Sequence, residues 1–107
     1  SNTDIKTIPW IDTSNVVDMN GMFDNCANLR TIPLLDTSNV WDIANMFRGC
    51  DNLVSVPDLE TSKVYASSFV FQNCYNLEFI NPYNFPNYDW SQTQSPNLRL
   101  KYPELFI

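Results

Sequence analysis

Hydrophobic and polar positions recur along this chain with a period of 24 residues. Aligned against itself, the sequence divides into three consecutive units without gaps, at residues 7–30, 31–54 and 55–78. Eight columns are identical in all three units: Pro9, Pro33 and Pro57; Thr13, Thr37 and Thr61; Ser14, Ser38 and Ser62; Val16, Val40 and Val64; Phe23, Phe47 and Phe71; Cys26, Cys50 and Cys74; Asn28, Asn52 and Asn76; Leu29, Leu53 and Leu77. A fixed period with apolar columns predicts a solenoid, because one coil cannot bury its apolar side alone and must stack on the next. The three phenylalanines of one column are then expected to lie in a single file.

Within one unit, the order of residues predicts a short strand, a turn and a short helix, and hence an α/β solenoid. The segment Leu29–Leu35 is expected to form a short strand that ends near Pro33, which cannot donate a ladder hydrogen bond. Residues 36–39, Asp-Thr-Ser-Asn, favour a turn because their side chains accept hydrogen bonds from nearby backbone N–H groups. Apolar residues then follow at the spacing of one helical face: Val40, Ile43, Met46, Phe47 and Cys50. We therefore expect a helix of two or three turns, or a 3₁₀ equivalent, from about Val40 to Phe47, and parallel strands about 4.8 Å apart where neighbouring coils pair.

The two ends of the chain differ from the repeats. Residues 1–6 align with the tail of a unit, so we expect them to be the end of a preceding repeat, and the chain to be a piece of a longer repeat protein. After Glu78 the register fades and prolines interrupt the pattern. Seven aromatic residues lie in the last stretch: Phe79, Tyr83, Phe85, Tyr88, Trp90, Tyr102 and Phe106. Residues 79–107 are therefore expected to form an aromatic C-terminal cap, since a linker would be polar and poor in rings.

Composition and charge exclude several classes of function. Six basic residues against twelve acidic ones give a net charge of −6, which disfavours binding to DNA or RNA. The chain has no histidine, which removes histidine general bases, Ser-His and Cys-His nucleophile pairs and histidine metal ligands. No run approaches the roughly 20 apolar residues that a membrane span requires. We therefore expect a protein that is not an enzyme, binds no cofactor and does not insert into a membrane.

Three equally spaced cysteines could suggest a metal or redox site. Zinc ligands, however, cluster with two to four residues between them, whereas Cys26, Cys50 and Cys74 lie 24 residues apart. Stacked coils would bring neighbouring cysteines within disulfide range, but their number is odd and their neighbours are apolar. We favour a buried ladder of free thiols that fills a narrow core.

Acidic residues form two columns. Asp12, Asp36 and Glu60 make up the first, while the second contains Asp18 and Asp42 and is interrupted by Ala66. Stacked carboxylates hold Ca²⁺ in some solenoids. Each residue of the first column directly precedes Thr-Ser, where a carboxylate caps the local turn, and we favour this role over a metal site.

Columns that vary between units are the places where packing does not dictate the residue. Three of these columns contain aromatic residues: Val17, Trp41 and Tyr65; Trp10, Leu34 and Asp58; Ala27, Asp51 and Tyr75. Exposed rings beside a polar, acidic surface are suited to bind a protein or a glycan. The alternative is that they cover the flank of the solenoid. Trp41 and Tyr65 are the first candidates for a binding surface, followed by Trp10 and Tyr75.

The repeated pattern MFxxCxNLxxIPxxDTSNVxxM resembles the BspA-like, or Treponema-type, leucine-rich repeats of bacterial surface proteins. The match rests on two sets of residues: Phe23, Cys26, Leu29, Ile32 and Pro33; Phe47, Cys50, Leu53, Val56 and Pro57. It extends from Asn2 to Pro82. The resemblance implies a right-handed solenoid of the leucine-rich-repeat type and a non-enzymatic role in adhesion or receptor binding at the bacterial cell surface.

We therefore expect a non-catalytic, extracellular binding or adhesion module that presents variable surface residues to a host or matrix protein or to a glycan. Repeats of the DTSNV type are also similar to those of bacteriophage-encoded proteins. An alternative is accordingly a structural or host-attachment component of a phage virion or of a surface layer, which would pack against copies of itself.

Overall fold

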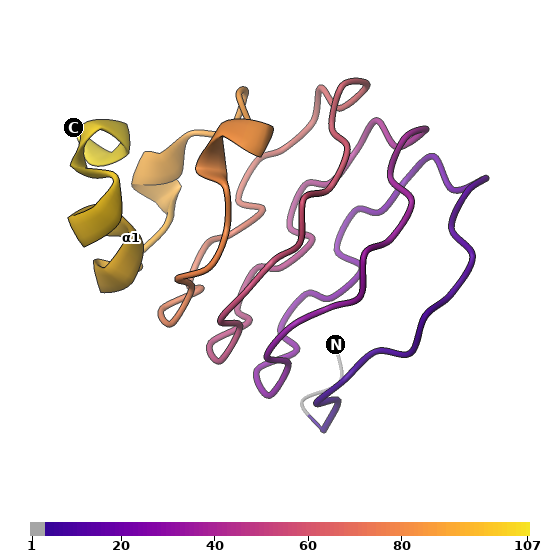
Figure 1. Ribbon diagram of the computed structural model, residues 1–107, viewed down its shortest axis with the longest axis horizontal. Coiled ribbons are helices and arrows are strands. Elements are labelled where there is room, and N and C mark those ends of the chain that lie inside the picture. Colours follow the sequence, from indigo (N-terminus) through magenta and orange to yellow (C-terminus); the bar gives the residue numbers. More distant parts are fainter. Residues whose placement is uncertain (1–3) are drawn as a thin grey trace.

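The 24-residue repeats form coils that lie side by side, and the short helices of the chain gather at its C-terminal end (Figure 1). This computed structural model describes residues 4–107 and measures 36 × 31 × 18 Å along its principal axes. Four short helices follow the repeats: the 3₁₀ helices η1 (Pro82–Asn84), η2 (Trp90–Gln92) and η3 (Pro103–Phe106), and the α-helix α1 (Pro96–Lys101). Residues 1–6 were expected to be the end of a preceding repeat, and the first three of them lie outside the described part.

Backbone hydrogen bonds join each coil to the next. The N–H groups of Met19 and Phe23 donate to the carbonyl oxygens of Asp42 and Met46, at 2.9 Å each. One repeat later, the N–H of Phe47 donates to the carbonyl of Val70 over the same 2.9 Å. Parallel bridges connect the equivalent positions Asp18, Asp42 and Ala66. The coils are therefore stacked in register, and equivalent residues lie beside one another.

The prediction of a short helix and a short strand in each coil is wrong. Among residues 4–107 every helix begins at Pro82 or later, and the parallel pairing is limited to isolated bridges. The N–H groups of Ile43 and Asn45 donate to the next coil rather than four residues back, and Asn45 has a φ of 60° that a right-handed helix does not allow. The segment Val40–Phe47 therefore has a parallel bridge at Asp42 followed by turns from Ala44 onward, and its apolar side chains at helical spacing are buried without forming a helix.

The core is a file of aromatic rings that runs across the coils. Phe23 stacks on Phe47 with ring centroids 5.5 Å apart, and Phe47 stacks on Phe71 at 5.6 Å. The expected single file of phenylalanines is confirmed. Trp90 of η2 continues it by stacking on Phe71 at 5.4 Å, so the file extends from the repeats into the C-terminal region.

Polar side chains of the C-terminal region accept hydrogen bonds from the last coil. The N–H of Phe69 donates to Oε1 of Gln92, and the N–H of Asn73 donates to Oε1 of Gln94, both at 2.9 Å. In the earlier coils the corresponding N–H groups donate to backbone carbonyls of the following coil. The two glutamine amides thus take the place of a further coil, which keeps these backbone donors satisfied.

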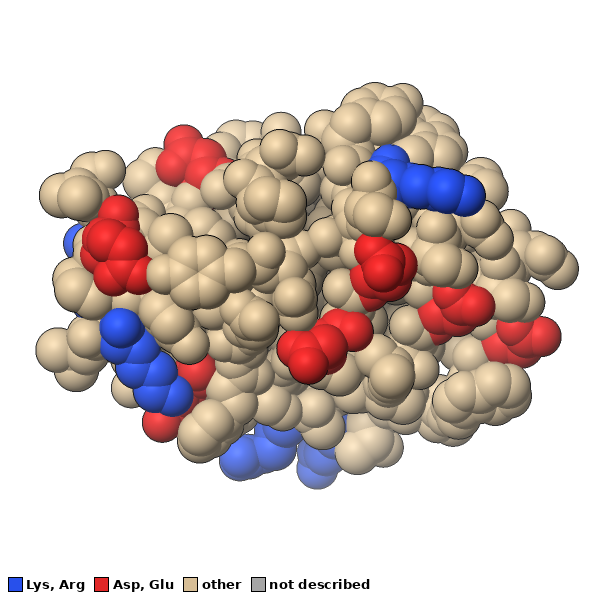
Figure 2. Space-filling model, turned by 45° about the horizontal axis from the view of Figure 1, so that its top comes forward, with Lys and Arg blue, Asp and Glu red and all other residues tan. Residues whose placement is uncertain are grey.

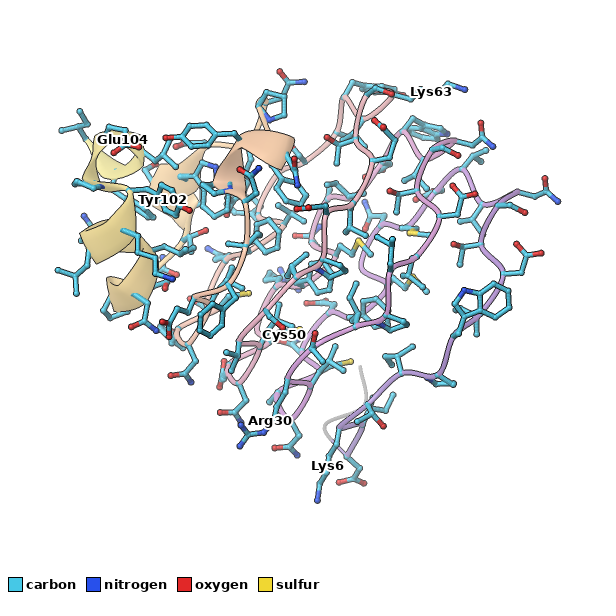
Figure 3. All side chains as sticks on the ribbon, in the orientation of Figure 1. Lys6, Arg30, Cys50, Lys63, Tyr102 and Glu104 are labelled. Carbon is cyan, nitrogen blue, oxygen red and sulfur yellow. The ribbon has the colours of Figure 1, made fainter. Side chains whose placement is uncertain are left out.

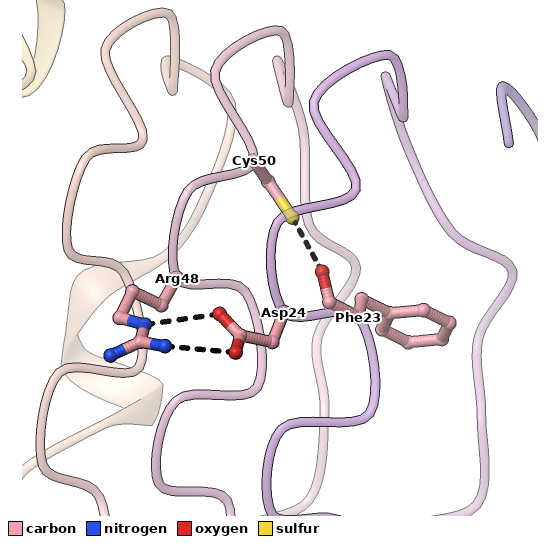
Figure 4. A network of polar contacts seen from close by, with 4 residues as sticks. All are labelled: Phe23, Asp24, Arg48 and Cys50. Atoms are coloured by element: carbon pink, nitrogen blue, oxygen red, sulfur yellow. Dashed lines mark hydrogen bonds and ion pairs between the residues drawn. The ribbon is translucent and has the colours of Figure 1, made fainter. Parts of the chain in front are cut away.

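The three cysteines are free and buried, as the buried thiol ladder requires. The Sγ of Cys50 donates to the carbonyl of Phe23 at 3.2 Å (Figure 4), and that of Cys74 donates to the carbonyl of Phe47 at 3.1 Å. Burial raises the pKa of the Cys50 thiol to about 12 and raises the pKa of Cys74 as well. Both thiols therefore stay protonated at neutral pH and bond one coil to the coil before it.

On the outside of the same turn, Arg48 and Asp24 join neighbouring coils through a two-pronged ion pair (Figure 4). The Nε of Arg48 donates to Oδ1 of Asp24 at 3.0 Å, and a terminal guanidinium nitrogen donates to Oδ2 at 2.9 Å. The hydrogen bond to Asp24 also raises the pKa of the guanidinium.

None of the helices in residues 4–107 has the length and apolar character that a membrane span requires.

Candidate binding surface

Trp41 and Tyr65 stack face to face on the outside of neighbouring coils. Their ring centroids are 5.3 Å apart and their planes differ by 11°. The backbone aligns them, because the N–H of Tyr65 donates to the carbonyl of Trp41 at 3.1 Å, and that of Trp41 to the carbonyl of Val17 at 2.9 Å. The exposed fraction is 36% for Trp41 and 71% for Tyr65. The stack, which we call the Trp41–Tyr65 ridge, therefore presents ring edges and much of Tyr65 to solvent.

A small hollow of about 160 Å³ adjoins Tyr65. Its other lining residues are polar or small: Ala66, Ser67, Ser68, Asn87, Asp89 and Gln92. Asp89 accepts hydrogen bonds from the N–H and the hydroxyl of Ser91 through Oδ1, which lowers the pKa of this carboxyl. The hollow therefore places a charged carboxylate near the exposed tyrosine.

Trp10 lies in a different hollow, a cleft of about 370 Å³. The lining combines apolar and acidic residues from three coils: Trp10, Ile11, Leu34 and Leu35; Asp12, Asp36, Asp58 and Glu60; Thr13 and Thr37. We call this hollow the Trp10–Leu34 cleft. It shares no lining residue with the hollow beside Tyr65.

Alternating burial explains how this cleft combines apolar and acidic side chains. Residues 34–36 lie in no helix or turn, and exposed and buried side chains alternate along them. Leu34 and Asp36 are exposed, whereas Leu35 between them is buried. The same alternation is repeated one coil later, where Asp58 and Glu60 are exposed and Leu59 is buried. Each of three neighbouring coils thus contributes one residue of the variable column and one of the acidic column to this cleft.

Capping of the local turn is confirmed for the first acidic column. Oδ1 of Asp12 and of Asp36 accepts the N–H two residues on at 3.0 Å, and Oε1 of Glu60 does the same at 2.8 Å. These bonds lower the pKa of all three carboxyl groups: the backbone N–H contributes most for Asp12 and Glu60, and the Ser38 hydroxyl for Asp36. Their charge is therefore held through neutral and mildly acidic pH.

The second acidic column has the same local role. Oδ1 of Asp18 accepts from the N–H of Asn20, and Oδ1 of Asp42 accepts from that of Ala44, both at 2.9 Å. Among the residues that the structure describes, no group of three or more acidic or cysteine side chains is arranged to hold a metal ion.

The four candidate aromatic residues are thus not brought into one site. Trp41 and Tyr65 form a stack, Trp10 lines the separate cleft, and Tyr75 is 46% exposed. No ring contact within residues 4–107 joins Tyr75 to the other three. The cleft was not predicted from the sequence, although the two-residue offset between the variable and acidic columns is consistent with side chains that share one side of the coil.

A comparison with protein families gives a match for this chain. No curated protein and no solved structure matches this chain. Residues 1–99 match a family of Mycoplasma proteins of unknown function that is described as DUF285. Since the match covers most of the chain, the protein belongs to the DUF285 family.

Proposed function

We propose that this protein is a non-catalytic, extracellular binding or adhesion module of a bacterium, which presents repeat-variable surface residues to a protein or glycan ligand. The proposal includes a finer description of the fold as a right-handed, leucine-rich-repeat-type solenoid of the BspA-like kind. Two features support this description: the resemblance of the repeats and the in-register stacking of equivalent residues, such as Phe23 on Phe47.

The constant and the variable columns of the coil have different roles, and this difference supports a role in binding. Columns that hold the fold together are constant, as in the buried Thr13 and Thr37, whose hydroxyls donate to backbone carbonyls of the next coil at 2.8 and 2.6 Å. The column of Trp41 and Tyr65 lies outside this network and is occupied by valine in the first repeat. Such a frame leaves the outer columns free to vary with the ligand.

The single observation that carries the proposal is the exposed Trp41–Tyr65 ridge. A tyrosine with 71% of its surface exposed is not held in place by the core. Aromatic side chains supply much of the binding energy in protein interfaces and combine an apolar ring with a polar group. The ridge is therefore the part of the surface best suited to contact a ligand.

The test is a binding assay on an array printed with matrix proteins and glycans. The double variant Trp41→Ala/Tyr65→Ala should lose binding to any ligand found with the unchanged protein, and should keep the same circular dichroism spectrum. Phe79→Ala is the matched control, because it removes a 57% exposed ring elsewhere and should retain binding. Binding that persists in the double variant would show that the ridge is not the binding surface. An array without any ligand, together with symmetric oligomers in light scattering, would favour a structural role instead.

A further inference from the structure

We propose that the Trp10–Leu34 cleft binds an extended, basic segment of a partner protein in which arginine and aliphatic side chains alternate. This inference goes beyond the proposed function, because it names a partner class for a surface other than the ridge. It concerns the cleft alone and is independent of the Trp41–Tyr65 ridge.

Apolar surface at this cleft is unusually open. Trp10 is 71% exposed and Leu34 is 60% exposed, so neither side chain is used to fill the core. Both lie in a hollow of about 370 Å³ rather than on a convex surface. A concave apolar surface with large exposed side chains is typical of a site that a partner covers. The open indole of Trp10 also offers a ring face on which a guanidinium group can lie.

The charge of the cleft is uncompensated. Its four carboxylates come from Asp12, Asp36, Asp58 and Glu60, and no lysine or arginine lines it. Among the basic side chains labelled in Figure 3, Lys6 and Arg30 lie at one edge of the coils and Lys63 lies at the opposite edge. Figure 2 shows acidic side chains following one another across part of the molecular surface.

The hydrogen bonds to these carboxylates come from neutral donors. The turn bonds of Asp12, Asp36 and Glu60 use Oδ1 or Oε1, and Oδ1 of Asp58 accepts from the side-chain amide of Asn84 at 3.0 Å. Asp12 and Asp36 also repel each other, because the charge of Asp12 opposes ionisation of Asp36. A cation placed between them would relieve this repulsion, and no existing ion pair would have to be broken for it to bind.

Spacing favours an extended peptide as the source of these cations. The acidic column advances by one coil at a time, so Asp12 and Glu60 are separated by about 10 Å, or two coil spacings. Side chains on one face of an extended peptide recur about every 7 Å. Two arginines of such a segment can therefore reach the acidic column in different coils. The aliphatic side chains between them point the opposite way, toward the neighbouring column of Trp10 and Leu34.

The experiment measures binding of synthetic peptides by fluorescence anisotropy. The probe is an octapeptide of alternating arginine and leucine, compared with one of alternating arginine and serine and one of alternating glutamate and leucine. The arginine–leucine peptide should bind, the arginine–serine peptide should bind at least threefold more weakly, and the glutamate–leucine peptide should not bind up to about 1 mM.

Protein variants locate the binding. Asp36→Asn keeps the acceptor of the turn and removes one charge, and it should weaken binding of the arginine–leucine peptide about threefold. Asp51→Asn makes the same change of net charge at an exposed position outside the cleft and should have no effect. Trp10→Ser should weaken binding about tenfold, whereas Leu100→Ser, which removes an 84% exposed leucine from α1, should not.

The outcomes separate this inference from the proposed function. Equal effects of Asp36→Asn and Asp51→Asn, or failure of the arginine–leucine peptide to bind, would overturn it, since attraction would then be absent or non-specific. In that case a ligand found on the array and lost in Trp41→Ala/Tyr65→Ala would leave the proposed function standing. Conversely, peptide binding that survives in this double variant and is weakened in Trp10→Ser would support the cleft alone.

Discussion

Trp90 lies face to face on Phe71, with ring centroids 5.4 Å apart and planes that differ by 8°. The tryptophan comes 19 residues after this phenylalanine rather than 24, so it takes the place of a fourth phenylalanine without being part of a fourth repeat. Phe85 and Tyr88 then meet Phe71 edge-on at 5.0 and 5.6 Å. The end of the ring file is thereby closed on more than one side.

Replacement of Trp90 by alanine should destabilise the protein strongly. The side chain is only 4% exposed, and deletion of a buried tryptophan typically costs about 3–5 kcal/mol because a cavity remains. Urea unfolding followed by circular dichroism measures this loss. Trp10→Ala is the matched control, since this 71% exposed residue should change the free energy of unfolding by no more than about 0.5 kcal/mol. Similar losses for both variants would show that the last ring does not close the core.

The buried thiols should be unreactive in the folded protein. Cys50 and Cys74 are fully buried, and thiolate, the reactive form, is disfavoured because burial raises the pKa of both groups. A chromogenic disulfide reagent at neutral pH should therefore label both cysteines only at the rate of unfolding, and rapidly in urea. Rapid labelling of either residue without denaturant would contradict their placement in the core.

The same burial predicts a loss of stability at alkaline pH. The pKa of Cys50 rises from 9.0 to about 12 on folding, and that of Tyr88 from 10.0 to about 12. A group whose pKa is raised by folding stabilises the folded state fully below its unfolded pKa, and this contribution is lost as pH rises towards the folded value. The free energy of unfolding should therefore fall from about pH 9 to pH 12. In Cys50→Ala/Cys74→Ala the decline should begin nearer pH 10, where tyrosine starts to ionise; an unchanged onset would contradict the assignment.

Much of the coil could be predicted from the repeat, because identical columns force equivalent residues together. The phenylalanine file and the buried cysteines follow from this rule alone. The same rule could not exclude the helix that the apolar spacing predicted at Val40–Phe47, which the structure does not contain. Apolar spacing is the same whether N–H groups bond within a coil or to the next one, and Asn45 adopts its positive φ only in the latter arrangement.

The closure and the cleft were harder to predict, for different reasons. Gln92 and Gln94 replace backbone acceptors of a missing coil, and no pattern marks a glutamine for that role. The repeat places the acidic and variable columns near each other but does not show that a hollow lies between them. Its acidic and apolar residues were nonetheless visible as neighbouring columns, so the candidate residue Trp10 was identified without its surroundings.

A substitution at Asp36 should separate the turn bond from the charge. Asp36→Asn keeps an oxygen that can accept the N–H of Ser38, whereas Asp36→Ala removes it. The urea midpoint at pH 7 should therefore be close to the unchanged value in the asparagine variant and lower in the alanine variant. Equal midpoints for all three proteins would show that this turn does not need the acceptor.

The pH dependence of these variants adds a second measurement. The bonds to Ser38 lower the pKa of Asp36 below its ordinary value of 3.8. A depressed carboxyl pKa contributes stability above the unfolded value, and this contribution is lost as pH falls through the folded value. The asparagine variant should therefore lose less stability than the unchanged protein below about pH 4. A steeper decline in that variant would contradict this sign.

Two glycines provide a test of how closely neighbouring coils approach. Gly21 and Gly49 have φ values of 66° and 75°, in the left-handed region where any Cβ costs about 1–2 kcal/mol. A Cβ on Gly49 would in addition lie 2.1 Å from Oδ1 of Asn25, in the preceding coil, whereas one on Gly21 would meet nothing closer than 3.9 Å. Gly49→Ala should therefore destabilise more than Gly21→Ala in urea unfolding.

A double-mutant cycle isolates the contact between the coils. Asn25→Gly removes the side chain that the new Cβ would meet and suits the 59° φ of that position. In this background the cost of Gly49→Ala should fall to that of Gly21→Ala, because only the backbone term remains. An undiminished cost would mean that the penalty at Gly49 is entirely local. The approach of Asn25 would then play no part in fixing the spacing between the first two coils.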